Sequence, residues 1–433
     1  LKERNGGANL AISSFKFVIR PKISKEKSMT ASTFSIPLLF LFLFVHFGVV
    51  GETQKVSISI EQKLQDTETP KPISWVVVPD KSGRSLLVLQ GGRVLILPPY
   101  ISETDILLFF ELSPEEMIVK DFEEGLLGLV FHPQYRSNGL FYLYHTLQEP
   151  KRSVLVERRV KDQTKLVLDR NHHRTLIEIE QPYWNHNSGV PEFGPDGYLY
   201  LSTGDGGKAN DPHDLSQNTF SLLGKVLRID VDRTEGALEY AIPEDNPFKN
   251  MPGYRGEIWT TGMRNPWRLH WDFPSNTLYC ADVGQHMKEE INLIKRGGNY
   301  GWSYREGTEV FSLKNREPSE EVEFIDPVFE YGHDEGTSVS GGIVYRGSKH
   351  PELYGHYIFG DWGTGKCWAI EVKNNRTVSK KYIEFVLDGE VINDLPKFVN
   401  GKPQSPFKPV NFCMSAANEL VLLDWKGMIY FTK

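Results

Sequence analysis

One pattern recurs six times along the chain: an apolar strand, a turn rich in Pro, Asp and Gly, and a second strand of alternating apolar residues that ends near Asp or Gly. A hairpin of two short strands cannot bury both of its faces alone, so neighbouring copies must stack on one another. Four-stranded blades packed around a channel meet that need. The six copies therefore predict an all-β, six-bladed β-propeller over residues 73–433. They begin at Trp75, Leu129, Pro191, Leu269, Gly341 and Phe412.

Local patterns agree with strands joined by tight turns. From 227 to 232 the chain reads LRIDVD, the two-residue period of a half-buried strand. The dipeptides Asn138-Gly139 and Asp196-Gly197 supply the positive φ that tight turns require. A β-sandwich would also show alternating strands, but six distributed copies of one signature favour the propeller. No long stretch has the period of an amphipathic helix.

The N-terminal segment has the pattern of a targeting signal. The apolar run Phe34–Val50 follows Lys25 and Lys27 and is followed by Gly51, where a signal peptidase could cut. An uncleaved signal anchor is the alternative, because the run is near the lower limit for a membrane span. The predicted divisions are a non-native leader (1–28, ahead of Met29), a signal peptide or anchor (29–51) and a linker (52–72).

This signal predicts a secreted, extracellular protein with no membrane span after cleavage. The sequon Asn375-Arg376-Thr377 is compatible with a secreted glycoprotein. The net charge of -7 and the lack of a clustered basic stretch argue against a nucleic-acid partner. The chain has three cysteines, and their odd number argues against a disulfide scaffold. We expect Cys280, Cys367 and Cys413 to be buried apolar residues of three different blades.

Loops at one face of a propeller converge on the central channel, so polar motifs far apart in sequence can meet there. The candidate segments are 123–128, 185–189, 204–207, 263–267, 282–285, 290–293 and 298–302, together with Lys366. These segments include His, Arg, Asn, Asp and Glu side chains, the types that carry general acid–base chemistry and charge stabilisation.

Five strings in this order resemble the signatures of the glucose/sorbosone dehydrogenase family and its Hedgehog-interacting-protein-like relatives. They are GLLGLVFHP, NHNSG with FGPDGYLYLSTGDGG, SLLGKVLRIDVD, GMRNPWR and EINLIKRGGNYGW, and the similarity spans about Glu123 to Ile370. The resemblance implies a six-bladed propeller. In the enzymatic members, this fold oxidises the anomeric hydroxyl of an aldose with pyrroloquinoline quinone held over Ca²⁺.

The resemblance also implies roles for individual residues. His186 matches the family's general base, and a hydrogen-bonded loop histidine is the alternative. Arg264 and Asn265 match the pair that contacts the quinone and stabilises charge on its oxygens, unless Arg264 forms an inter-blade salt bridge. Lys366 matches a quinone-binding lysine or is a solvated surface lysine. Glu123 and Asp205 complete the predicted cofactor-binding set.

Two calcium sites follow from the same resemblance. Glu290 and the carbonyl of Tyr300 match a structural site, and carbonyls around Gly284 and Gln285 match the ion beneath the quinone. Calcium prefers carboxylate and carbonyl oxygens in a loose shell. The family's enzymes have a Gly-Pro step where this chain has Gly284-Gln285, a change that alters backbone geometry but not the number of carbonyls.

The sequence departs from the enzymes at two further places. Where they carry two arginines that clamp the quinone carboxylates, this chain has Phe407-Lys408-Pro409, so only Lys408 could contribute. Glu123 replaces a glutamine and adds a negative charge. Two functions therefore stay open: a calcium- and quinone-dependent sugar dehydrogenase, or a non-catalytic extracellular module that binds a protein or a glycan.

Overall fold

The computed structural model describes residues 54–100, 105–117, 119–311, 317–319, 321–393, 397–399 and 402–433. They belong to one compact unit, which spans Gly51–Lys433. The predicted leader (1–28) and signal segment (29–51) lie outside the described residues. In the described ranges, no helix has the length and apolar character needed to cross a membrane.

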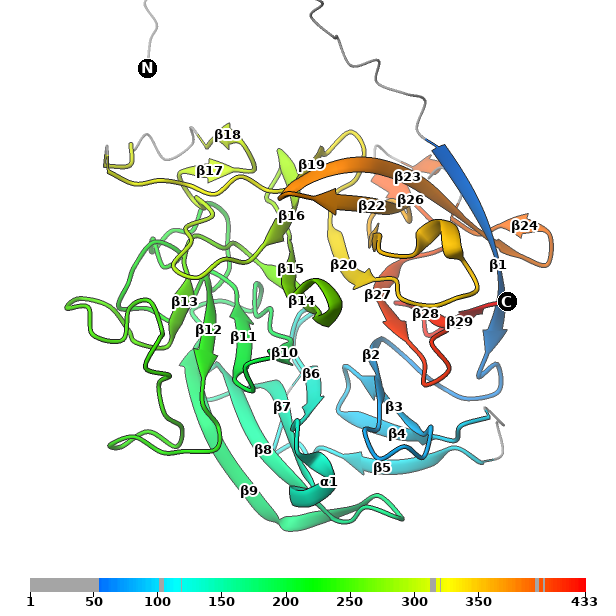
Figure 1. Cartoon of the computed structure of the whole chain (residues 1–433), viewed down its shortest axis with the longest axis horizontal. Coiled ribbons are helices and arrows are strands. Elements are labelled where there is room, and N and C mark those ends of the chain that lie inside the picture. Colours follow the sequence, from blue (N-terminus) through cyan, green and yellow to red (C-terminus); the bar gives the residue numbers. More distant parts are fainter. Residues whose placement is uncertain are drawn as a thin grey trace, which may run out of the picture. The chain divides into compact units, whose positions relative to one another are not determined.

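Four sheets of four strands share one order, in which each strand pairs antiparallel with its neighbours (Figure 1). The first contains β2 (Pro72–Val77), β3 (Ser85–Leu89), β4 (Arg93–Leu97) and β5 (Leu107–Glu111). The second contains β6 (Leu126–Phe131), β7 (Leu140–Leu147), β8 (Arg152–Asp162) and β9 (Val167–Glu180). The third contains β10 (Pro191–Phe193), β11 (Leu199–Thr203), β12 (Lys225–Ile229) and β13 (Ile258–Thr260). The fourth contains β14 (Pro266–Asp272), β15 (Thr277–Asp282), β16 (Lys288–Leu293) and β19 (Phe329–Gly332).

The remaining long strands form one nine-stranded sheet. Its first part runs through β20 (Val339–Val344), β21 (Tyr357–Asp361), β22 (Cys367–Lys373) and β23 (Arg376–Leu387). It continues through β1 (Gln54–Lys63), β29 (Ile429–Thr432), β28 (Leu420–Asp424) and β27 (Pro409–Met414), and β24 (Glu390–Val391) pairs with β23. Two small hairpins add β17 (Arg305–Glu306) with β18 (Glu309–Val310) and β25 (Lys397–Val399) with β26 (Lys402–Gln404).

Residues 52–72 were predicted to be a linker, but residues 54–63 of this segment form the strand β1, so the prediction is wrong for this part. β1 pairs in parallel with β23 and antiparallel with β29, so an N-terminal strand joins the last two predicted units. Ile58 and Ile60 alternate with exposed neighbours and are fully buried, which gives β1 the period of a half-buried strand. The propeller-like arrangement therefore contains four separate sheets and one joint sheet, where the sequence predicted six separate blades.

The first strands of the six predicted units contact one another in a closed ring (Figure 1). The ring runs β2, β6, β10, β14, β20, β27 and back to β2. Each copy of the sequence pattern covers the first strands of its unit, which confirms the repeat. Loops that precede or follow these strands at one end of the ring are brought together around its axis.

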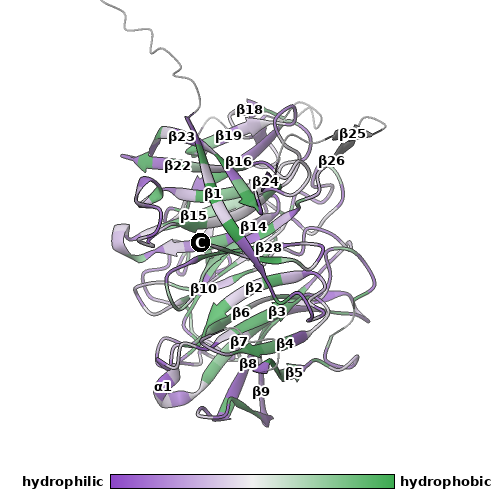
Figure 2. Cartoon of the chain, turned by 90° about the vertical axis from the view of Figure 1, so that its right-hand side faces the viewer, coloured by the Kyte–Doolittle hydropathy of each residue, from purple (hydrophilic) through white to green (hydrophobic). Residues whose placement is uncertain are grey.

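Hydrophobic clusters fill the spaces between neighbouring sheets, such as that of Leu86 and Val88 with Leu143 and Phe141. Six such clusters occupy the described part of the chain. In Figure 2, stretches of β3, β4 and β6 carry the green of apolar residues. All of β12 is buried, so the expectation of a half-buried strand at 227–232 is wrong at its N-terminal half. Both faces of the sheet are covered here. The charged Arg228 is buried and pairs with two more exposed carboxylates, those of Asp196, at 2.9 Å, and Asp245, at 2.8 Å.

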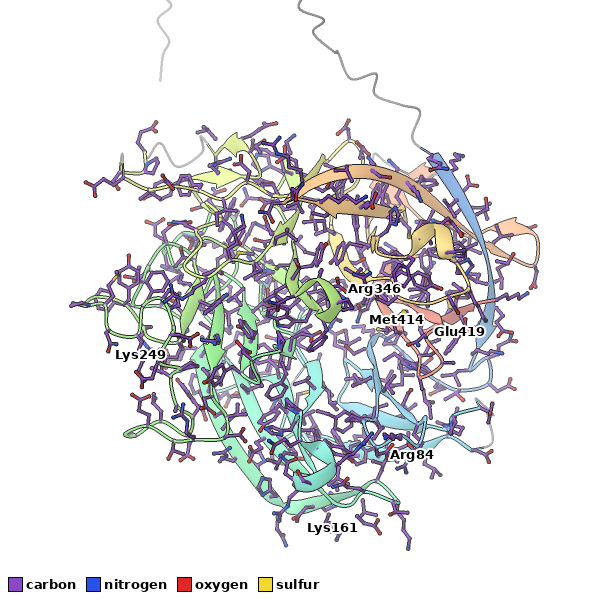
Figure 3. The ribbon with its side chains drawn as sticks, viewed as in Figure 1. Arg84, Lys161, Lys249, Arg346, Met414 and Glu419 are labelled. Carbon is purple, nitrogen blue, oxygen red and sulfur yellow. The ribbon has the colours of Figure 1, made fainter. Side chains whose placement is uncertain are left out.

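The three cysteines are free and buried, as predicted. Gly197 and Gly139 have φ of +81° and +68°, which confirms the predicted positive φ. Gly139, however, caps the short helix α1 (Tyr135–Asn138) rather than a two-residue hairpin. Between sheets, Arg346 (labelled in Figure 3) donates to Asp272, with Nε 2.9 Å from Oδ1, and links the segment after β20 to the end of β14.

Glu192 of β10 lies along the ring axis, together with Arg268 of β14. Burial raises the pKa of Glu192 to about 8, against the opposing charge of Arg268. The folded carboxyl therefore holds its proton to higher pH than the unfolded carboxyl does, and this contribution to stability is lost as the pH rises from about 4.5 to 8. We expect the melting temperature to fall over this range, and to fall less for Glu192→Gln. Equal slopes for the two proteins in thermal melts would contradict this expectation.

Candidate functional site

A cavity of about 290 Å³ lies among the converging loops. Its walls come from the segments before β6, β10 and β14, from the start of β20, and from the turns after β21 and β28. The residues that contribute include Glu123, His186, Arg264, Asn265, Trp362 and Trp425. The expected convergence of polar motifs from different units therefore takes place, and five predicted site residues line one cavity: Glu123, His186, Arg264, Asn265 and Gly284.

His186 is held by the buried carboxylate of Asp205. The His186 Nδ1 atom lies 2.6 Å from Asp205 Oδ1, and Trp302 Nε1 donates to Asp205 Oδ2 at 2.8 Å. Because an ionised carboxylate only accepts hydrogen bonds, the imidazole carries its proton on Nδ1. Nε2 is then the nitrogen with the lone pair. The pair therefore has the arrangement of a general base oriented by a carboxylate.

Glu123 connects His186 to Asn265. The backbone N–H of His186 donates to Glu123 Oε2 at 2.7 Å, and Asn265 Nδ2 donates to the same oxygen at 3.5 Å. Ser188 Oγ donates to Asn265 Oδ1 at 2.5 Å. Glu123 is thus a cavity-lining residue that also positions two predicted catalytic residues. Neither Ser188 nor Trp302 was singled out from the sequence, although both belong to quoted motifs.

Arg264 and Asn265 are fixed through their backbone. Both N–H groups donate to the buried carboxylate of Asp282, at 2.9 and 2.7 Å. The Arg264 guanidinium lies over the Trp302 ring, and its Nη1 donates to the carbonyls of Val283 and Gly284 at 2.7 and 2.6 Å. In the described part of the chain, Arg264 forms no ion pair, and its guanidinium donates to these two carbonyls instead.

The other predicted residues are dispersed. Lys366 is half-buried and does not line the cavity. Gly284 lines the cavity, whereas the Gln285 side chain donates to Asn210 Oδ1 at 2.7 Å. Glu290 is buried and accepts from Gly307 N and Asn292 Nδ2, while the Tyr300 hydroxyl donates to the Leu293 carbonyl. Within the described ranges, no group of three His, Cys, Asp or Glu side chains is arranged to hold a metal ion.

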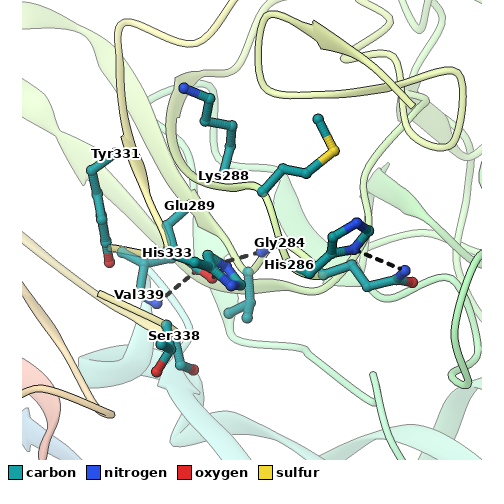
Figure 4. A network of polar contacts seen from close by, with 12 residues as sticks. Gly284, His286, Lys288, Glu289, Tyr331, His333, Ser338 and Val339 are labelled. Atoms are coloured by element: carbon teal, nitrogen blue, oxygen red, sulfur yellow. Dashed lines mark hydrogen bonds and ion pairs between the residues drawn. The ribbon is translucent and has the colours of Figure 1, made fainter. Parts of the chain in front are cut away.

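The buried carboxylate of Glu289 holds two residues of the cavity wall through their backbone. Glu289 Oε2 accepts from the backbone N–H of Gly284 at 3.3 Å and of Val339 at 2.9 Å (Figure 4). Its Oε1 lies 2.9 Å from His333 Nε2. Burial lowers the pKa of His333, but the hydrogen bond and charge of Glu289 outweigh it, so the pKa is raised overall. Glu289 thereby connects two cavity-lining residues from neighbouring sheets.

Glu306 fixes the turn that follows Gly284. Its Oε1 accepts four consecutive backbone N–H groups, from Gln285 to Lys288, at 2.7, 2.9, 2.8 and 3.1 Å. The side chain is buried. Glu306 was not predicted as a site residue, since nothing in its local sequence shows that a distant turn will wrap around its carboxylate.

An aromatic rim, defined here as Phe122, Trp362 and Trp425, forms one side of the cavity. The Phe122 ring centroid lies 5.7 Å from that of Trp362 and 4.8 Å from that of Trp425. Lys408 Nζ lies 3.8 Å from the Trp362 ring centroid, and Lys71 Nζ lies 5.0 Å from that of Trp425. The rim therefore combines apolar faces with two ammonium groups.

These contacts test how the predicted cofactors fit. A planar anion fits, because the cavity has aromatic faces and Arg264, with Lys71 and Lys408 at the rim, against the single lining carboxylate of Glu123. Calcium at Gly284 and Gln285 does not fit this arrangement, because the Gly284 carbonyl already accepts from the Arg264 guanidinium at 2.6 Å. We derive no catalytic step through a calcium ion at that position.

Comparison with known proteins identifies the family of this chain. The family model described as "Glucose / Sorbosone dehydrogenase" matches residues 69–391, so the chain belongs to this family. HIPL1 protein of Arabidopsis thaliana is 32% identical over 374 residues, which cover 70% of this chain and 53% of that protein. Mouse Hedgehog-interacting protein is 28% identical over 305 residues, 67% of this chain and 41% of that protein. The chain thus spans about half the length of these curated relatives.

Solved structures show the same fold. The soluble aldose sugar dehydrogenase of Escherichia coli, in its apo form, superposes with a TM-score of 0.67 at 20% identity and covers 86% of this chain and 99% of that one. The PQQ-bound aldose sugar dehydrogenase of Streptomyces coelicolor gives 0.60 at 22% identity, covering 86% and 98%. At this identity the likeness establishes the propeller-like fold alone.

Proposed function

We propose that this protein oxidises a hydroxyl group of a sugar, with His186 as the base and a planar quinone as the hydride acceptor. The observation that carries the proposal is the contact of His186 with the buried Asp205 at the wall of the cavity. Asp205, itself held by Trp302, fixes the imidazole of His186 in the tautomer whose Nε2 can accept a proton, which is the arrangement that a general base needs. We also propose that the scaffold has six blades, the nine-stranded sheet being the last two joined through β1.

In this proposal the chain supplies proton transfer and orientation. His186 Nε2 takes the proton of the sugar hydroxyl, and Asp205 stabilises the imidazolium that forms. When bound, a quinone supplies the acceptor for the hydride that leaves the same carbon, so the alcohol becomes a carbonyl or lactone. Arg264 and Asn265 would hold the quinone from the cavity wall. The Arg264 guanidinium is a fixed donor toward charge that develops on an oxygen.

The test is to supply the purified protein with Ca²⁺ and pyrroloquinoline quinone and to follow dye reduction with a panel of aldoses. We expect sugar-dependent reduction. Quinone binding without reduction of dye by any aldose would contradict the proposed activity. It would favour the second candidate, an extracellular module that binds a protein or glycan, which the added charge of Glu123 in the cavity supports.

We propose calcium at the structural site, with Glu290 and the Tyr300 carbonyl as ligands. Glu290 is buried next to the cross-strand Asp282, and a cation there would offset two neighbouring negative charges. Chelation is expected to lower the melting temperature of wild type, because a ligand that binds only the folded state stabilises it. Glu290→Gln should melt at one temperature with and without chelator. A wild-type curve indifferent to chelator would contradict the site.

We further propose secretion. The predicted signal lies outside the described residues, but Asn375 of the sequon is exposed in the turn between β22 and β23, where a glycan can be attached. Protein expressed through the secretory route should lose mass on enzymatic deglycosylation, and Asn375→Gln should not. An unchanged mass of the wild type would contradict modification at this sequon.

A further inference from the structure

The aromatic rim is built by segments far apart in the sequence. Phe122 precedes β6, Trp362 follows β21 and Trp425 follows β28. Each is anchored through its backbone: the Phe122 carbonyl accepts from Gln90 Nε2 at 2.8 Å, Trp362 N donates to Ser338 O at 2.8 Å, and Trp425 N donates to Lys408 O at 2.9 Å. The rim is therefore a positioned part of the fold and not a chance contact of loose side chains.

The two lysines are positioned by the same anchors. Gln90, which holds Phe122, also donates its backbone N–H to the Lys71 carbonyl at 3.0 Å. Lys408 N donates to Asp424 Oδ2 at 2.9 Å, in the turn that carries Trp425. Lys71 Nζ lies over Trp425 and, at 5.9 Å, over Phe122, whereas Lys408 Nζ lies over Trp362. Among the described residues, neither ammonium group forms an ion pair with a carboxylate.

This arrangement has a clear ligand preference. An ammonium group on an aromatic face gains about 0.5–2 kcal/mol, less than a charge-assisted contact with a carboxylate or several of them. A ligand that carries carboxylates can therefore draw the two lysines from the rings and use the exposed faces for stacking. A neutral sugar offers no such exchange. Arg264 lines the same cavity, so one cation in the cavity and two on its aromatic rim accompany a lining that contains one carboxylate, Glu123.

We propose that Lys71 and Lys408, together with the aromatic rim, form a clamp for a planar aromatic ligand that carries carboxylate groups. The clamp takes the place of the arginine pair that the sequence lacks at Phe407-Lys408-Pro409. One of the two lysines of the clamp, Lys71, directly precedes β2. This inference deepens the proposed function, and it rests on that function only in the choice of a quinone tricarboxylate as the natural ligand.

Two planar anions test the clamp without any turnover: pyrroloquinoline quinone and trimesate, a benzene ring with three carboxylates and no redox chemistry. Binding is measured by calorimetry and by the fluorescence of the tryptophans at the rim. We expect both to bind wild type, with affinity that falls as salt is raised. Lys71→Met with Lys408→Met should weaken both at least about tenfold. The corresponding double Arg variant should bind both anions at least as tightly as wild type does, because the charge is kept and a guanidinium pairs with carboxylates and stacks on aromatic rings.

The controls make every outcome decisive. Lys55→Met removes a lysine that lies 5.9 Å over the Tyr382 ring, on β1 and away from the cavity, and should bind as wild type does. If the double Met variant has a lower melting temperature than wild type, binding is measured with the single Lys408→Met variant instead. The clamp is overturned if the double Met variant binds as tightly as wild type, if wild type binds neither anion, or if uncharged benzenetrimethanol binds equally well. Lysine-dependent trimesate binding without sugar oxidation would uphold the clamp and contradict the proposed enzyme.

Discussion

Replacing His186 with alanine is expected to lower the turnover of sugar by about 10²–10⁴-fold, the usual contribution of a positioned general base. The quinone affinity should change little, because in the proposed function His186 contacts the hydroxyl to be oxidised, while Arg264 and the rim hold the anion. Asp205→Asn is expected to lose turnover as well. An amide can donate to Nδ1 and would favour the tautomer whose Nε2 carries the proton and cannot accept one.

His213→Ala is the matched control for this prediction. His213 is an exposed histidine of the neighbouring loop that stacks on Tyr183, with ring centroids 5.8 Å apart, and it does not line the cavity. Its removal should leave turnover unchanged. Stopped-flow measurement of dye reduction, together with calorimetric quinone binding, separates chemistry from affinity. If His186→Ala and His213→Ala turn over at the same rate, His186 is not the base.

The second large effect is expected at Glu306. Removing its carboxylate by Glu306→Ala leaves four backbone N–H groups of one turn without their acceptor. Each unpaired buried donor costs about 1–3 kcal/mol, and water can reach some of them, so we expect a loss of about 3 kcal/mol in the free energy of unfolding. Quinone affinity should fall too, because the same turn holds the Gly284 carbonyl that fixes Arg264.

Urea denaturation measures this effect against two comparisons. Glu306→Gln keeps an oxygen that can accept these bonds, without the charge, and should lose about 1 kcal/mol. Glu309→Ala removes a nearby glutamate whose side chain is 53% exposed and pairs with Lys288 at 3.0 Å, and exposed pairs contribute about 0–1 kcal/mol. Equal midpoints for Glu306→Ala and Glu309→Ala would show that the carboxylate does not hold the turn.

Much of the candidate site could be predicted from local sequence. His186, Arg264, Asn265 and Glu123 come from motifs at equivalent edges of the repeat, and the structure places all four at one cavity. Lys366 also belongs to such a segment but does not line the cavity. Its place in the fifth unit was predictable, whereas the direction in which a long half-buried side chain points depends on neighbours from other sheets.

The six copies of the strand–turn–strand pattern indicated by themselves that this chain is all-β and closes around a channel, because a hairpin of two short strands cannot bury both faces alone and must stack on its neighbouring copies. Tertiary structure alone decided how the ring is closed and what meets at its axis. β1 pairs with strands more than 300 residues away, opposite Lys381 and Thr432. Lys71, which comes after β1 in the chain, lies at the aromatic rim. Such pairings depend on complementary edges and charges across the whole fold, and no local spacing of residues encodes them.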